Sequence, residues 1–98
     1  MTVLELDPKD DYVLTIYLPF TSAGTPKLFM NATDLSSSLT YSEVVTGAPE
    51  GTLSKLTINI KADSITASIA GCVDCYFDNG TNSKTRVLYA RARIANVC

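Results

Sequence analysis

The residues best suited to chemistry are the three cysteines, two of which lie in the segment GCVDCYF at residues 71–77. Thiolates bind metals and form disulfides, and a CxxC spacing is shared by zinc sites and redox proteins. A tetrahedral zinc site needs four ligands, usually cysteine and histidine, whereas this chain has three cysteines and no histidine. Zinc would therefore need an aspartate ligand or a second subunit, and the composition argues against a metal site.

The spacing of Cys72 and Cys75 also argues against a redox pair. Redox CxxC motifs begin a helix in an α/β fold, whereas these cysteines lie in a run that resembles a strand. In an extended strand they are about 10 Å apart and point to opposite faces, which is beyond the reach of a disulfide. Strand parity predicts that Cys75 points inward with Val73 and Phe77, and that Cys72 points outward.

A disulfide formed by an outward-facing thiol remains as a hypothesis. The candidates are Cys72 and the final residue, Cys98, bonded within the chain or to a neighbouring subunit. The simpler alternative is that Cys75 is a small buried hydrophobe and the other two cysteines are free thiols. A reducing cytoplasm favours free thiols, whereas an assembly released from the cell would oxidise later.

Other catalytic patterns are absent from the sequence. Without histidine there is no Ser-His or Cys-His pair, and no GxSxG, GxxxxGK[ST] or GxGxxG motif occurs. Two pairs of carboxylates could act as an acid and a base: residues 10–11, and Asp74 with Asp78. Carboxylates in loops are more typical of solvated turns than of active sites. The segment DNGTN (78–82) lacks the spaced acids and bidentate Glu of a calcium loop. We therefore predict a protein that is not an enzyme and uses no cofactor or metal.

A basic stripe near the C-terminus could contact another macromolecule. It comprises Arg86, Tyr89, Arg91 and Arg93, with Lys84 as an extension. Nucleic-acid surfaces combine basic and aromatic residues, but the net charge of −2 supplies no general attraction to phosphate. Arginines on a strand more often pair with acids of a neighbouring strand or subunit, and the acids of residues 5–11 are a complement. The remaining alternative is that water alone solvates the stripe. We therefore expect Tyr89, Arg91 and Arg93 at a protein interface.

Alternation of apolar and polar residues predicts strands through most of the chain. The clearest is residues 52–62, where Leu56, Ile58 and Ile60 share one face. In residues 85–98, one face carries Leu88, Ala90, Ala92 and Ile94, and the opposite face carries Tyr89, Arg91 and Arg93. We expect residues 73–77 and 86–94 to pair antiparallel across a loop at 78–84.

In three other segments the alternation of apolar and polar residues is less regular. Residues 64–71 alternate as Ile65, Ala67 and Ile69, which predicts a second strand after 52–62. Residues 11–18 are apolar on both faces, which predicts a central strand or one covered on both sides. Residues 33–45 fit either a strand or a capped helix, and the serine run favours the strand.

These elements predict one domain over residues 1–98, with residues 1–10 as a candidate extended arm. The fold class is all-β: a small sandwich or barrel of about 6–8 mostly antiparallel strands. The longest apolar run, residues 12–20, is interrupted by Thr15 and Pro19 and is too short to span a bilayer. The acidic N-terminus is unlike a signal peptide, so we expect synthesis in the cytoplasm and no membrane contact.

A compact β domain rich in Ser and Thr, without catalytic groups, looks like small structural proteins of phage virions, especially capsid decoration (cement) or tail proteins. The resemblance implies protein partners: a homo-oligomer, with a trimer as one form, on a larger assembly in a virion. The expected interface residues are Val3, Leu4, Leu6, Tyr89, Arg91 and Arg93. The alternatives are a small carbohydrate-binding module that stacks sugars on tyrosines, and a nucleic-acid-binding small barrel, which is less favoured.

Overall fold

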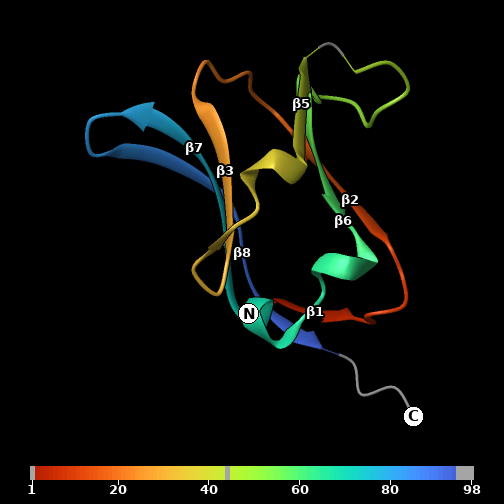
Figure 1. The fold of residues 1–98 in the computed structure, drawn as a ribbon. Coiled ribbons are helices and arrows are strands. Elements are labelled where there is room, and N and C mark those ends of the chain that lie inside the picture. Colours follow the sequence, from red (N-terminus) through yellow and green to blue (C-terminus); the bar gives the residue numbers. More distant parts are fainter. Residues whose placement is uncertain (1, 44, 95–98) are drawn as a thin grey trace.

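The computed structural model describes residues 2–43 and 45–94, which form eight strands in two sheets (Figure 1). The five-stranded sheet has the order β1 (Thr2–Leu6), β8 (Ser83–Ile94), β7 (Gly71–Gly80), β3 (Thr25–Met30), β4 (Thr33–Asp34). The three-stranded sheet has the order β2 (Tyr12–Leu18), β6 (Ser54–Ile60), β5 (Leu39–Glu43). All neighbours are antiparallel except β1 and β8, which are parallel. The all-β prediction is confirmed, and neither sheet closes into a barrel.

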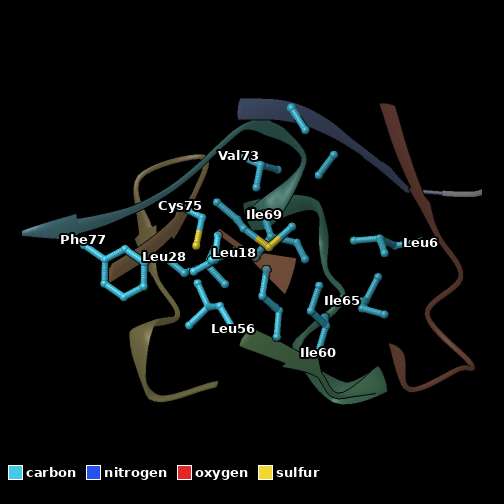
Figure 2. Packing of buried hydrophobic residues seen from close by; sticks show 14 residues of the cluster. Leu6, Leu18, Leu28, Leu56, Ile60, Ile65, Ile69, Val73, Cys75 and Phe77 are labelled. Carbon is cyan, nitrogen blue, oxygen red and sulfur yellow. The ribbon is translucent and has the colours of Figure 1, made fainter. Parts of the chain in front are cut away.

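The two sheets contribute to a single apolar core (Figure 2). From β6, Leu56, Ile58 and Ile60 are almost completely buried, as the alternation of residues 52–62 predicts. Facing residues come from β7, and among these Phe77 packs edge-to-face against Phe20 and Tyr41, with ring centroids 6.2 and 5.2 Å away. The period of two along each strand therefore selects which side chains leave water.

The predicted strand over residues 64–71 is wrong. Two short 3-10 helices, η2 (Ala62–Ser64) and η3 (Ala67–Ile69), lie there, and strand β7 begins only at Gly71. Ile65 and Ile69 are buried but Ala67 is exposed. Buried residues four apart fit a run of tight turns as well as a strand, and the Ala and Ser between them have little β-propensity.

The prediction that residues 11–18 form a central or doubly covered strand is also wrong. β2 is an edge strand of the three-stranded sheet, and only one of its faces packs on the core. Its other face is exposed, because no further layer of the described chain lies over that side of the sheet. The apolar composition of both faces was therefore a poor guide to burial.

The two remaining segments differ in detail from their predictions. Residues 33–45 contain β4, a 3-10 helix η1 (Ser36–Ser38) and β5, so the predicted strand is interrupted at the serine run. Between β7 and β8 the loop is shorter than predicted, because Gly80 and Ser83 are still paired and only Thr81 and Asn82 connect them. Side-chain hydrogen bonds accompany both differences: Asp34 Oδ1 accepts from the backbone N–H of Ser36, and Asp78 Oδ1 accepts from that of Gly80.

The N-terminal segment is part of the sheet. β1 pairs with β8 from Thr2 opposite Ala90 to Leu6 opposite Ile94. Leu6 is 2% exposed and Leu4 packs against the core. Among the described residues, no helix is long and apolar enough to cross a membrane.

Candidate interaction surface on the five-stranded sheet

The outward-facing side chains of the five-stranded sheet form one surface, which we call the outer face. Strand alternation places most of them opposite the core residues of the same strands. Lys84 and Arg86 join them because the β7–β8 register shifts between Cys75 and Tyr76. Across β1, β8, β7 and β3 the surface comprises Val3, Glu5, Lys84, Arg86, Tyr89, Arg91, Arg93, Cys72, Asp74, Tyr76, Lys27 and Phe29.

Strand register brings four of the predicted interface residues together on the outer face. Val3 lies opposite Arg91 across the parallel β1–β8 pair, and Arg91 lies opposite Cys72 across β8–β7. Tyr89 and Arg93 flank Arg91 on the same face of β8. Val3 and Tyr89 are 55% and 47% exposed, so the middle of this surface carries apolar area beside cationic side chains.

The other two predicted interface residues point the other way. Leu4 and Leu6 alternate with Val3 and Glu5 along β1, so they face the core of their own chain. The apolar side chains of this segment are therefore divided between the core and the outer face, and only Val3 is available to a partner in the structure.

Ion pairs organise the charges on the outer face. Arg86 donates from Nε to Oδ1 of Asp74 at 2.9 Å and from Nη2 to Oδ2 at 3.1 Å. These hydrogen bonds, and the negative charge of Asp74, raise the pKa of Arg86. The guanidinium also lies 4.7 Å from the centre of the Tyr89 ring. Two partners thus fix the position of Arg86.

The expected pairing of the basic stripe with the N-terminal acids is found at one position. Arg93 Nε lies 3.9 Å from Oε1 of Glu5 on the neighbouring strand β1. Both side chains are largely exposed, so water screens this pair and it contributes little to stability. Arg86 instead pairs within the β7–β8 hairpin, with an aspartate that the sequence analysis assigned to a solvated turn.

An aromatic pair extends the outer face toward β3. The rings of Phe29 and Tyr76 stack with centroids 6.3 Å apart and planes 10° apart, and Lys84 Nζ lies 4.5 Å from the centre of the Tyr76 ring. Phe29, Asp74 and Tyr76 were not among the predicted interface residues, because their proximity depends on β3, β7 and β8 being neighbours. Parity within each strand indicated outward positions but not which strands adjoin.

A shallow groove of about 640 Å³ lies at the end of the outer face near the start of β7. Val3, Arg91 and Arg93 line it together with Ala67 and Ala70 of the turn that precedes β7. Three of the predicted interface residues therefore share one apolar depression with a cationic rim.

The two cysteines of GCVDCYF lie in opposite environments, as parity predicts. Cys75 is fully buried, and burial, together with the charge of Asp74, raises the pKa of its thiol to about 12. Cys72 is exposed on the outer face. Cys98 lies outside the described residues, so the hypothesis of a disulfide between Cys72 and Cys98 stays a prediction.

Within residues 2–43 and 45–94, no three cysteine or carboxylate side chains gather where they could hold a metal ion. Comparison of the chain with protein-family models, with curated proteins and with solved structures found no match.

Proposed function

We propose that the protein is a non-enzymatic structural protein that acts through subunit contacts, as a phage virion component such as a capsid decoration or tail protein. The observation that supports this most is the outer face: an uncovered sheet on which Val3, Tyr89 and Arg91 lie together. In this proposal the two sheets form an open β-sandwich whose core supports the fold while its outer surfaces bind partners.

The composition of the outer face suits a protein partner. Tyr and Arg are the residues that interface centres favour, because each combines a large contact area with hydrogen-bonding groups. Arg86 is already held by Asp74 and Tyr89, so little side-chain entropy remains to be lost when a partner covers it. A contact area of this kind requires no reactive side chain.

Three of the five tyrosines are poorly placed for the alternative function of carbohydrate binding. A sugar stacks on a free aromatic face, but Tyr76 is stacked on Phe29 and approached by Lys84. Arg86 lies over Tyr89. The hydroxyl of Tyr41 accepts a hydrogen bond from the backbone N–H of Ser22. Their positions fit packing and protein contacts better than a sugar platform.

Size-exclusion chromatography with light scattering tests the proposal on the full chain. We expect a closed oligomer at micromolar concentration, and we expect Arg91→Glu to reduce it to a smaller species because a carboxylate then lies at the middle of the outer face. Lys9→Glu, a charge reversal at an exposed loop position, is the matched control and should leave the mass unchanged.

Two results would contradict the proposal. One is a monomer at all concentrations that binds glycans. The other is a monomer whose affinity for DNA falls steeply with salt, since that dependence indicates release of counterions from phosphate.

A further inference from the structure

Exposed apolar side chains also gather on the three-stranded sheet, away from the outer face. Five large hydrophobic side chains of the described chain are strongly exposed, and only Val3 and Tyr89 of these lie on the outer face. The other three are Val13 and Tyr17 on β2, at 63% and 49% exposed, and Leu53 at 52%. The backbone N–H of Leu53 donates to the carbonyl of Leu18, which places Leu53 beside the end of β2.

β2 is a regular strand with one open edge. It pairs with β6 without a register shift, from Tyr12 opposite Ile60 to Leu18 opposite Ser54. β2 ends the strand order of its sheet, so along its other edge it has no neighbouring strand within the described residues (Figure 1). An edge of this kind presents a row of backbone N–H and C=O groups that can accept another strand.

β2 also lacks the features that normally protect an edge. Proteins discourage edge pairing with charges, prolines, bulges or very short strands. The seven residues YVLTIYL contain no charge and no proline. The other strands that end a sheet are each protected: β1 carries Glu5, β5 carries Glu43, and β4 has two residues. The parts of β8 and β3 that extend beyond β1 and β4 carry Lys84 and Arg86, and Pro26 and Lys27. The sequence therefore leaves the most apolar of these edges without protection.

We propose that β2 pairs antiparallel with β2 of a second copy, about a two-fold axis at Thr15, to form a continuous six-stranded sheet. This inference rests on the proposed function and adds a contact distinct from the outer face. The strand is self-complementary in that register. On the exposed side, Val13 meets the partner's Tyr17, and the two Thr15 side chains meet each other. On the core side, Leu14 meets the partner's Ile16.

The flanking residues fit the same register. Asp11, directly before β2, lies opposite the partner's Pro19, so the two Asp11 carboxylates stay at opposite ends of the pairing. Pro19 has no backbone N–H and therefore ends the ladder after Leu18. Each β-branched residue in the exposed row meets an aromatic or a second β-branched residue, which are favourable cross-strand pairs.

Thr15→Lys tests the pairing. In the paired dimer the substitution places two ammonium groups against each other at the axis, whereas in the separate chains each ammonium group is solvated. We expect the dissociation constant of the β2 contact to rise at least a hundredfold by sedimentation velocity, with an unchanged circular dichroism spectrum. Thr40→Lys is the matched control, since Thr40 is exposed on β5, at the opposite edge of the same sheet. It should not change the association.

Cross-linking tests the register. In a Cys72→Ser, Cys98→Ser background, mild oxidation should join two chains of Thr15→Cys through a disulfide at the axis. Val13→Cys should not cross-link, because residue 13 lies opposite the partner's Tyr17. Equal cross-linking of the two variants would overturn the register and with it the proposal.

The two proposals fail in different ways. An oligomer that Thr15→Lys leaves intact overturns the β2 pairing but supports an assembly function through another surface. A monomeric unmodified chain that binds glycans or DNA overturns both. An oligomer that dissociates with Thr15→Lys, but not with Thr40→Lys, supports both.

Discussion

Ala32 occupies a backbone conformation that usually belongs to glycine or asparagine. Asn31 and Ala32 have φ angles of 51° and 68° and connect Met30 to Thr33 in the β3–β4 hairpin. Two-residue hairpin turns of this type need positive φ at both central positions. Asparagine tolerates that conformation, but the Cβ of alanine lies too close to the neighbouring carbonyl oxygen.

Ala32→Gly should therefore stabilise the protein by about 0.5–1 kcal/mol, since relief of the strain exceeds the added freedom of the unfolded chain. The free energy of unfolding, measured in urea, checks this. Ala23→Gly, in an exposed loop without positive φ, should instead be neutral or destabilising. Stabilisation by both substitutions to the same extent would contradict the explanation.

Cys75 makes stability depend on pH in the alkaline range. Its pKa is about 12 in the folded chain and about 9 as an ordinary thiol. The folded state thus retains a proton that the unfolded chain releases, and stability is complete below pH 9 and falls as the pH rises toward 12. A single group with this shift contributes a slope of at most about 1.4 kcal/mol per pH unit.

Comparison with Cys75→Ala isolates this contribution, because tyrosines and lysines also titrate in that range. We expect the variant to be less stable at pH 7 but to lose stability less steeply between pH 9 and 11 in urea titrations. Parallel pH dependence in the two proteins would show that Cys75 does not carry the effect.

At the scale of elements, β1 combines two roles in five residues. Leu6 is buried against the core while Val3 projects from the outer face. Leu6→Ala should lower the free energy of unfolding by about 2–4 kcal/mol, since it removes buried apolar atoms and leaves a cavity. Val3→Ala on the same strand should cost less than about 0.5 kcal/mol in dilute protein.

Urea denaturation of the two variants measures the difference. Equal, small effects would mean that β1 is a detachable arm rather than a strand of the sheet. Equal, large effects would mean that Val3 also packs within its own chain.

At the scale of the whole molecule, both sheets depend on one core. Leu56 on β6 and Leu28 on β3 are fully buried in the same cluster, although they belong to different sheets (Figure 2). Neither sheet can bury its apolar face alone, so we expect the described domain to unfold in one cooperative transition.

Leu56→Ala and Leu28→Ala should each lower the unfolding free energy by about 2–5 kcal/mol. In each variant, far-ultraviolet circular dichroism and tyrosine fluorescence should report the same midpoint. Separate midpoints in either variant would show that the sheets unfold independently.

The sequence alone was sufficient for features with a local cause. The period of two along residues 54–60, 71–77 and 88–94 predicted which side chains are buried, including Cys75 inside and Cys72 outside, because pleating alternates side chains whatever the neighbouring strand is. The alternation fails just before Leu88, where the β7–β8 register shifts: Val87 packs against the core and Arg86 is exposed. The all-β class followed from the same periodicity.

Only the tertiary structure decided which strands adjoin. The pairing of β1 with β8, which places Val3 beside Arg91, and the exposed edge of β2 depend on free energy gained between residues far apart in the chain. The alternation of residues in a strand shows that one face is apolar. Burial of that face requires a second layer of the protein packed against it, and no local pattern predicts that layer. Residues 11–18 therefore indicated a central strand or one covered on both sides, whereas in the fold β2 is the open edge of its sheet.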